Sequence, residues 1–418
     1  MRKLGAVAAT AVAIAAAGAT SVQAEAADTA AISGLNSPDR IAGRYIVVLK
    51  DSAGVATATS TAERMVGASV GHVYRSAVHG YSARMSQADA ARVAQLPGVQ
   101  FVQADERVEA TAQTLPTGIN RANADASPTA AIDGTDQRVD VDVAVIDTGA
   151  DLDHPDLNVY QQGATNCSLL GVTPDDQNGH GTHVSGTIGA LDNGTGVVGM
   201  APGARIWPVK VLNAAGVGSS SDVICGIDYV TAHADQIEVA NMSLGGDGSD
   251  DHNCGRTDGD AEHAAICDSV AAGVTYAVAA GNDSADAANS VPAAYDEVIT
   301  VSALSDFNGQ PGGGAASTCR SDVDDTFADY SNYGSDVDLI APGTCIDSTW
   351  MNGGYNTISG TSMATPHVTG AAALYLSTHP GATPAQVKSA LQAAGSSDWN
   401  AVDDPDNTKE PLLDVTGF

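Results

Sequence analysis

Residues 141–149 read Val-Asp-Val-Ala-Val-Ile-Asp-Thr-Gly, a nearly apolar run that ends in a carboxylate and a glycine turn. The run from Val141 to Ile146 is typical of a strand in a parallel sheet that is buried on both faces. Asp147 follows that strand directly, at the sheet edge where sites form in α/β proteins. Taken alone, such an Asp is more often a turn or capping residue. This stretch predicts an α/β fold and marks a first candidate site residue.

Further apolar runs alternate with helical patterns along the rest of the chain. The expected strands are 204–212, 239–244, 274–280 and 298–303, and the expected helices include 222–233 and 261–271. Strands that alternate with helices indicate a parallel sheet. Asn282 follows the strand expected at 274–280, so we expect it at the same sheet edge as Asp147.

The segment Asn178-Gly179-His180-Gly181-Thr182-His183 places two histidines three residues apart. This pair could bind a metal, but the helical zinc motif needs a spacing of four with a glutamate between, and the segment has no acid. Glycines on both sides of His180 allow close backbone approach and present the imidazole at a helix start. A lone histidine here would be interpreted as structural.

The segment Gly360-Thr361-Ser362-Met363-Ala364 leads into an Ala-rich helix that continues through Leu376. Ser362 is expected near the N-terminus of that helix, where free N–H groups and the helix dipole favour negative charge. A helix-capping serine is the alternative interpretation. Each motif alone is ambiguous, but together a carboxylate, an imidazole and a hydroxyl in the order Asp147, His180, Ser362 predict nucleophilic catalysis by serine.

The first 111 residues differ in composition from the rest. Residues 1–24 have a charged start, an apolar stretch and a small-x-small cleavage pattern at 22–24, which indicate a secretory signal. An N-terminal membrane anchor is less favoured, because the apolar run is short and rich in Ala and Gly. The region 44–109 shows a small α+β pattern. Its expected strands are 44–49, 81–85 and 99–102, and its expected helices are 61–66 and 87–96.

The charge of the chain excludes several function classes. The formal net charge is −32 over 418 residues, and the region 112–418 alone carries 8 basic and 41 acidic side chains. Nucleic acids and anionic membranes require a basic face, and a hydrophobic content of 43% is too high for a disordered chain. We expect an enzyme that tolerates or requires salt, because salt screens such self-repulsion. The plainer explanation of the acidic excess is that the protein comes from a lysine-poor proteome.

All six cysteines lie after residue 111: Cys167, Cys225, Cys254, Cys267, Cys319 and Cys345. An even number of cysteines in an exported domain suggests disulfides. The sequence contains no C-x-x-C pair, so a zinc knot is not indicated. Six cysteines allow fifteen connectivities, of which pairing of sequence neighbours, 254–267 and 319–345, is the simplest.

The motifs above resemble those of the subtilisin-like serine peptidases, in the subtilisin and proteinase K branches, from about residue 44 to the C-terminus. The Asp, His, Ser order is the one known for subtilisin. The resemblance implies a three-layer α/β fold with a mostly parallel central sheet in a peptidase domain, 112–418. It also implies an inhibitor-type α+β propeptide, 25–111, with its core at about 44–109. Asp147, His180 and Ser362 take the triad positions, and Asn282 takes that of the oxyanion donor.

The resemblance also implies binding sites for substrate and for calcium. The residues expected along the substrate are Gly216, Val217, Gly218, Ser243, Leu244, Gly245, Ala279, Ala280 and Gly281. The expected calcium ligands are the side chains of Gln113, Asp156 and Asn193 and the carbonyls of Leu191, Thr195 and Val197, with a weaker cation site near Asp338. In this interpretation Gln113 becomes a ligand only after the N-terminus is released. The bond between Val291 and Pro292 aligns with a cis bond of the family.

The expected function is that of a secreted, calcium-binding serine endopeptidase, made as a zymogen that cleaves itself between Thr111 and Ala112. Its partners would be protein substrates and its own propeptide, without nucleic acid or membrane, and we expect a monomer. Asp283 and Ser290 fall near the first pocket, for which we expect broad specificity with an apolar or aromatic preference. Three alternatives remain: a permanent accessory domain in place of the propeptide, a serine esterase, and a degenerate binding or inhibitor scaffold. The esterase would need a G-x-S-x-G elbow, and the scaffold would be expected to lack a triad member.

Overall fold

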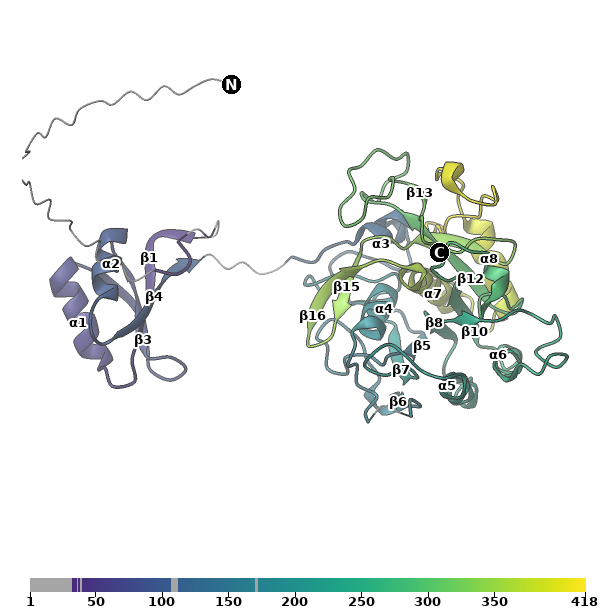
Figure 1. Ribbon diagram of the computed structural model, residues 1–418, viewed down its shortest axis with the longest axis horizontal. Helices are drawn as coiled ribbons and strands as arrows, with labels where there is room; N and C mark the ends of the chain where they lie inside the picture. The colour runs from purple at the N-terminus through teal and green to yellow at the C-terminus, as the bar shows by residue number, and fades with distance from the viewer. Residues whose placement is uncertain (1–31, 36, 38–39, 107–111, 170–171) are drawn as a thin grey trace, which may run out of the picture. The chain divides into compact units, whose positions relative to one another are not determined.

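The computed structural model describes residues 32–35, 37, 40–106, 112–169 and 172–418 (Figure 1). The chain divides into two compact units, Met1–Glu109 and Ala110–Phe418. The predicted signal segment 1–24 and Thr111 lie outside the described residues. Ala112, on the other side of the predicted cleavage point, is described and exposed.

The first unit is a four-stranded antiparallel sheet with two helices, in the strand order β2-β3-β1-β4. Its elements are β1 (Arg40–Leu49), α1 (Val55–Val66), β2 (Ser69–Tyr74), β3 (Gly80–Arg84), α2 (Gln87–Ala94) and β4 (Val99–Glu106). Strand β2 was not predicted from the sequence. This strand pairs with β3 alone and is largely exposed, so it lacks the apolar alternation by which a strand is recognised.

The second unit is built on an eight-stranded sheet in the order β13-β12-β10-β8-β5-β7-β6, with β14 paired to β12. All pairs are parallel except β12 with β13. The strands are β5 (Asp142–Asp147), β6 (Thr165–Asn166), β7 (Arg205–Lys210), β8 (Val239–Met242), β10 (Thr275–Ala279), β12 (Ile299–Ser305), β13 (Thr326–Phe327) and β14 (Leu339–Pro342). The predicted mostly parallel sheet is confirmed.

Helices cover this sheet (Figure 1). The described residues also form two small two-stranded ribbons. The helices are α3 (Thr117–Arg121), α4 (His180–Gly189), α5 (Ser220–Ala232), α6 (Ala261–Ala271), α7 (Thr361–Thr378) and α8 (Pro384–Ala394). The ribbons pair β9 (Gly246–Asp247) with β11 (Ser290–Val291) and β15 (Ile346–Trp350) with β16 (Gly354–Ile358). Short 3₁₀ turns lie at Ala124–Ala126, Gln161–Gly163, Ala287–Asn289 and Ala401–Asp403.

The side-chain alternation of β5 explains the three layers. Val143 and Val145 belong to an apolar cluster that includes Val184 of α4 and Val368 of α7. Ala144 and Ile146 belong to a second cluster, which includes residues of α5 and α6. Because successive side chains of a strand point to opposite faces, one apolar run serves both layers.

Three disulfides tie loops to this framework. They join Cys167 to Cys225, Cys254 to Cys267 and Cys319 to Cys345. The two pairings expected between sequence neighbours are confirmed. The bond between Val291 and Pro292 is cis. In the described part of the chain, no helix has both the length and the apolar character that spanning a bilayer would require.

Candidate active site

Asp147 and His180 meet at the carboxyl edge of the sheet. Asp147 ends β5 and is fully buried, while His180 begins α4, and its Nδ1 lies 2.8 and 2.9 Å from the two carboxylate oxygens of Asp147. Burial lowers the pKa of His180, but the charge of Asp147 and the hydrogen bond to it outweigh burial and raise the pKa above its ordinary value of 6.5. Since the carboxylate accepts from Nδ1–H, it leaves the lone pair on Nε2.

Asp176 organises the start of α4 and was missed in the sequence analysis. Its Oδ1 accepts from the hydroxyl of Thr148 at 3.0 Å and from the N–H groups of Asn178 and Gly179 at 2.9 and 3.0 Å. Its Oδ2 accepts from the N–H and hydroxyl of Thr182 at 3.0 and 2.6 Å. An acidic residue just before a helix start was the available signal. Asp176 therefore holds the loop that presents His180 to the carboxylate of Asp147.

Ser362 lies in the first turn of α7, as predicted. In the described part of the chain its Oγ donates to the carbonyl of Ser243 at 3.3 Å and makes no hydrogen bond to His180. The Ser243 hydroxyl donates in return to the Ser362 carbonyl at 2.8 Å. Catalytic hydrogen bonds are often long or misaligned without substrate. These two contacts join the start of α7 to the segment after β8.

Asn282 follows β10 and is held by the same helix start. Its Oδ1 accepts from the N–H of Thr361 at 2.9 Å and from the Thr361 hydroxyl at 3.1 Å. An amide whose oxygen is engaged in this way has its NH₂ group turned to the other side as a donor. Thr361, which the sequence analysis did not single out, thus orients Asn282 beside Ser362.

Two adjoining cavities form one groove along these residues. The first, of about 470 Å³, is lined by His180, and the second, of about 370 Å³, by Ser362 and Asn282. They share the wall from 244 to 247. Every residue expected along the substrate lines one cavity or both: Gly216, Val217, Gly218, Ser243, Leu244 and Gly245 in the first, and Leu244, Gly245, Ala279, Ala280 and Gly281 in the second.

Other polar residues also line the groove, and three of them are Asp283, Ser290 and Glu262. Asp283 and Ser290 line the second cavity, beside Ala279, Ala280 and Gly281. Glu262 lines the first cavity and was not foreseen. Burial raises the pKa of Glu262 to about 7, and the charge of Asp260 adds to the shift. Glu262 has the sequence pattern of an ordinary acidic residue in the first turn of a helix, so nothing in the sequence indicated that it lines the groove.

His183 does not share a metal site with His180. Its Nε2 donates to the carbonyls of Ile346 and Asn356 at 2.9 and 3.1 Å, on the β15–β16 ribbon. Burial lowers the pKa of His183 to about 3, so the ring is neutral. The two imidazoles therefore serve different partners, which removes the metal interpretation of the pair.

The loop expected to bind calcium receives Gln113. The Nε2 of Gln113 lies 2.9 Å from the Leu191 carbonyl and 3.3 Å from the Val197 carbonyl. The backbone N–H of Gln113 donates to the Gly194 carbonyl at 3.1 Å. These contacts are present in the uncleaved chain, so the segment that begins at Ala112 already pairs with this loop before cleavage. The expectation that Gln113 becomes a calcium ligand only after release of the N-terminus stays a prediction.

Asp156 brings a carboxylate to the same loop. Its Oδ1 accepts from Asn193 Nδ2 at 2.8 Å and its Oδ2 from Val197 N–H at 3.0 Å, while Asn193 Oδ1 accepts from the N–H and hydroxyl of Thr195 at 2.8 and 2.7 Å. Burial raises the pKa of Asp156, a penalty that a bound cation offsets. Carbonyl, amide and carboxylate oxygens gathered at one loop are the hard ligand set that suits calcium.

The weak cation site expected near Asp338 is not supported. Lys388 Nζ lies 2.8 Å from Asp338 Oδ2, which also accepts from the N–H of Thr300 at 2.9 Å. Gln392 donates to the other carboxylate oxygen at 3.1 Å. The lysine ammonium already supplies the positive charge that a bound cation would bring.

Each of the two units matches a known protein family. Residues 139–409 match the subtilase family, and residues 44–111 match the peptidase inhibitor I9 family. An extracellular serine proteinase of Thermus sp. (strain Rt41A) is 38% identical over 387 residues, which cover 86% of each chain. Subtilisin E of Bacillus subtilis (strain 168) is 38% identical over 72% of this chain and 71% of that protein.

One solved structure extends the comparison to the fold. The crystal structure of a cold adapted subtilisin-like serine proteinase matches with a TM-score of 0.54 at 33% identity. The match covers 72% of this chain and 98% of that chain. Sequence and fold thus point to the same group of proteins.

Proposed function

The chain belongs to the subtilase family of serine peptidases, and from that premise we propose that it is an exported endopeptidase whose triad is Asp147, His180 and Ser362. The observation that carries this proposal is the hydrogen-bonded pair of Asp147 and His180, set in a groove that Ser362 and Asn282 also line. A serine hydroxyl is a poor nucleophile at neutral pH and needs a base. The groove gives it an imidazole held by a buried carboxylate.

The proposed mechanism assigns one task to each group. His180 Nε2 takes the proton of the Ser362 hydroxyl as Oγ attacks the peptide carbonyl, and returns it to the leaving amine as the C–N bond breaks. The acyl-enzyme that remains is hydrolysed by water, which gives a proton to the same Nε2 as it attacks, and Ser362 Oγ then takes that proton back as it leaves. Asp147 keeps the proton of the ring on Nδ1 and stabilises the imidazolium that forms. The Asn282 NH₂ and the Ser362 N–H donate to the oxyanion, and losing one such donor typically costs roughly 3 kcal/mol of barrier stabilisation.

Hydrolysis of casein tests the activity itself. We expect the secreted protein to degrade casein and to lose that activity after treatment with a serine-directed phosphonylating reagent, with the label on Ser362. Hydrolysis of simple esters without cleavage of casein would favour the esterase, and a protein inert toward both would favour the degenerate scaffold. Among peptides, we expect apolar or aromatic side chains before the cleaved bond to be preferred, since the second cavity is walled by Ala279, Ala280 and Gly281.

The first unit is the proposed propeptide. Its match to the I9 inhibitor family ends at residue 111, next to the proposed cleavage between Thr111 and Ala112. Cleavage there would leave Val108 and Ala110 in the fourth and second subsites before the bond. Mass spectrometry of the secreted protein identifies its first residue, and a permanent accessory domain would instead remain attached on SDS gels.

Calcium is the proposed structural ion, held by Gln113, Asp156 and Asn193 with the carbonyls of Leu191, Thr195 and Val197. When bound, it neutralises buried carboxylate charge and ties the residues after Ala112 to the loop. We expect chelation to lower the melting temperature, because a ligand present at 100 times its Kd stabilises the folded state by about 2.7 kcal/mol. Differential scanning calorimetry with and without calcium measures this shift.

Variants assign the calcium effect to this loop. Asp156→Asn should melt at the same temperature with and without calcium. Asp133→Asn, which removes an exposed carboxylate from a nearby turn, should respond as the wild type does. A calcium response of wild-type size in Asp156→Asn would contradict the proposed ligand set.

The acidic surface leads to a proposal about salt. Residues 112–418 contain 41 acidic and 8 basic side chains, so the peptidase unit repels itself at low ionic strength. Salt screens that repulsion, with a Debye length of about 3 Å at 1 M. We therefore expect the melting temperature to rise from dilute to molar NaCl at constant calcium. An unchanged melting temperature would leave only the lysine-poor composition as an explanation.

A further inference from the structure

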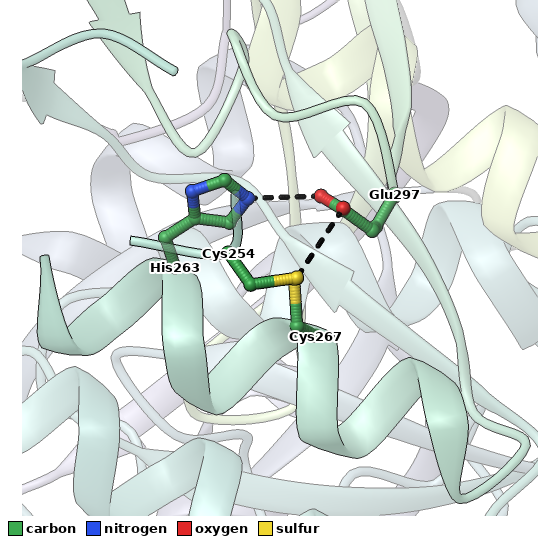
Figure 2. Close-up of side chains that lie close together, drawn as sticks. All are labelled: Cys254, His263, Cys267 and Glu297. Atoms are coloured by element: carbon green, nitrogen blue, oxygen red, sulfur yellow. Dashed lines mark hydrogen bonds and ion pairs between the residues drawn. A yellow bond between two sulfur atoms is a disulfide. The ribbon is translucent and has the colours of Figure 1, made fainter. Parts of the chain in front are cut away.

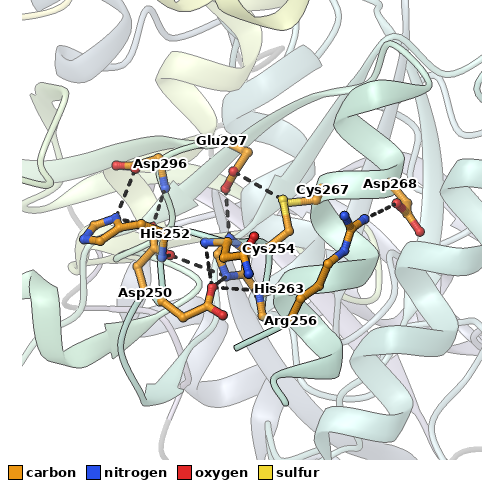
Figure 3. The surroundings of a disulfide bond; sticks show 12 residues. Asp250, His252, Cys254, Arg256, His263, Cys267, Asp268, Asp296 and Glu297 are labelled. Atoms are coloured by element: carbon orange, nitrogen blue, oxygen red, sulfur yellow. Dashed lines mark hydrogen bonds and ion pairs between the residues drawn. A yellow bond between two sulfur atoms is a disulfide. The ribbon is translucent and has the colours of Figure 1, made fainter. Parts of the chain in front are cut away.

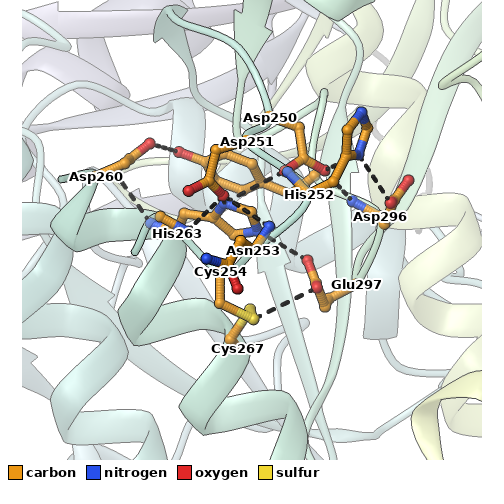
Figure 4. A network of polar contacts seen from close by, with 12 residues as sticks. Asp250, Asp251, His252, Asn253, Cys254, Asp260, His263, Cys267, Asp296 and Glu297 are labelled. Atoms are coloured by element: carbon orange, nitrogen blue, oxygen red, sulfur yellow. Dashed lines mark hydrogen bonds and ion pairs between the residues drawn. A yellow bond between two sulfur atoms is a disulfide. The ribbon is translucent and has the colours of Figure 1, made fainter. Parts of the chain in front are cut away.

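A second group of ionisable side chains lies around the start of α6. It contains Asp250 and Asp251 from the loop after β9, His263 from α6 and Glu297 from the segment before β12 (Figure 4). The disulfide between Cys254 and Cys267 closes the same loop onto the helix (Figure 3). None of these residues takes part in the mechanism proposed above.

The His263 ring is held in one orientation. Its Nε2 lies 2.9 Å from Glu297 Oε2 (Figure 2). Its face stacks on Tyr295, with ring centroids 4.0 Å apart and planes 4° apart. Only 1% of the side chain is exposed. Because a carboxylate accepts, the proton of a neutral ring lies on Nε2 and the lone pair lies on Nδ1.

That lone pair faces two carboxylates. His263 Nδ1 is buried and makes no hydrogen bond in the described part of the chain. It lies 3.5 Å from Asp250 Oδ1 and 3.5 Å from Asp251 Oδ1. Buried polar atoms are nearly always paired, and three electron-rich atoms turned toward one another repel unless a positive charge lies between them.

We propose that Asp250, Asp251 and His263 bind a divalent transition-metal ion of the zinc type. Two donors that each lie about 2.1 Å from zinc at the tetrahedral angle are about 3.4 Å apart, close to the separations from Nδ1 to each carboxylate oxygen. A water molecule would supply the fourth ligand. An imidazole in the ligand set favours zinc over calcium, whose ligands are oxygens.

The surroundings of His263 match those of a metal-ligating histidine. Such histidines usually donate their second ring N–H to a carboxylate, which fixes the tautomer and raises ligand basicity. Glu297 has that role here. Asp251 is fixed in turn, because its carboxylate accepts from the N–H groups of Asn253, Gly255 and Thr257 at 2.7 to 2.8 Å.

Two neighbouring groups are not part of the proposed site. Cys254 and Cys267 cannot offer thiolates while they are joined, and a disulfide sulfur has no hydrogen, so the 3.7 Å approach of Cys254 Sγ to Glu297 is only a contact. His252 is 75% exposed and lies 3.2 Å from Asp296 on the outer side of Asp250. An exposed histidine beside carboxylates is explained by protonation in water.

A metal ion here would support one end of the substrate groove. His263 directly follows Glu262, which lines the cavity that contains His180. Asp260 caps α6 by accepting from the N–H groups of both residues at 2.9 and 3.2 Å. The ion would join the loop after β9 to this helix start, independently of the calcium loop and of the triad.

Metal binding by the secreted protein tests the proposal without any measurement of activity. The protein is treated with chelator, returned to saturating calcium without reductant, and titrated with Co²⁺. We expect one equivalent to give the visible absorption of a tetrahedral site and to be displaced by one equivalent of Zn²⁺, with metal content measured by mass spectrometry. Asp251→Asn and His263→Gln should each weaken Zn²⁺ binding by more than about 100-fold, and Glu297→Gln by about 10- to 100-fold.

Two matched variants locate the ion. Two variants should bind Zn²⁺ as the wild type does. Asp268→Asn changes a residue of the same helix that is 75% exposed, and Asp296→Asn changes the partner of His252, outside the proposed site. The proposal is overturned if the wild type takes up no Zn²⁺. It is also overturned if Asp251→Asn binds normally or if Asp296→Asn abolishes binding. None of these three results would contradict the proposed peptidase function.

Discussion

Ser362→Ala is expected to lose casein hydrolysis almost completely and to accumulate as the uncleaved precursor. The hydroxyl is the only nucleophile in the proposed mechanism, and what remains is the contribution of the oxyanion donors and of substrate binding. Loss of the catalytic serine lowers kcat about 10⁶-fold in subtilisin itself, a member of the same family, and we expect a loss of that order here. SDS gels of secreted protein and kcat with a soluble peptide substrate measure both effects.

The control for this prediction is Ser389→Ala, which removes an exposed hydroxyl of α8 that donates only to the carbonyl one turn earlier. It should mature and cleave casein like the wild type. If purified Ser362→Ala still separates its first unit in isolation, processing between Thr111 and Ala112 is the work of another protease. If it still hydrolyses casein, Ser362 is not the nucleophile.

Asp147→Asn is expected to lower kcat by about 10⁴-fold, the size of the corresponding change in another triad peptidase. The asparagine NH₂ can donate to His180 Nδ1 and thereby favour the tautomer that cannot accept the proton of Ser362. The wild-type structure shows both carboxylate oxygens of Asp147 within 2.9 Å of that nitrogen. Little of this loss should come from folding, because the two side chains have nearly the same shape.

The same variant tests the pH dependence. His180 acts as a base only when neutral, so activity falls as the pH falls through its pKa. In the wild type, burial lowers that pKa, but Asp147 raises it above 6.5, and the acid limb of kcat/KM should therefore lie above that value. In Asp147→Asn the raising charge is gone, so the acid limb should move to lower pH. An unchanged limb, or the same shift in the exposed variant Asp153→Asn, would contradict the assignment.

Several features of the protein could be predicted from the residues alone. The apolar run at 141–146 was recognisable as a strand because it is buried on both faces, and the helix at 261–271 because its buried residues recur at the spacing of a helical turn. The segments around Asp147, His180 and Ser362 carried their chemistry locally, in glycines and small residues beside a reactive side chain. The near-neighbour disulfides, 254–267 and 319–345, close short loops, which made them the simplest pairings.

Other features depend on residues that are distant in sequence and were decided by the tertiary structure. The contacts of Thr361 with Asn282 and of Lys388 with Asp338 each join segments whose local patterns are those of ordinary surface residues. The zinc-type site likewise appears only when Asp250, Asp251 and His263 are packed together. The period of a strand or helix shows which side of that element is buried. Which atom faces a given carboxylate depends on how whole elements pack together, and no local sequence pattern encodes that packing.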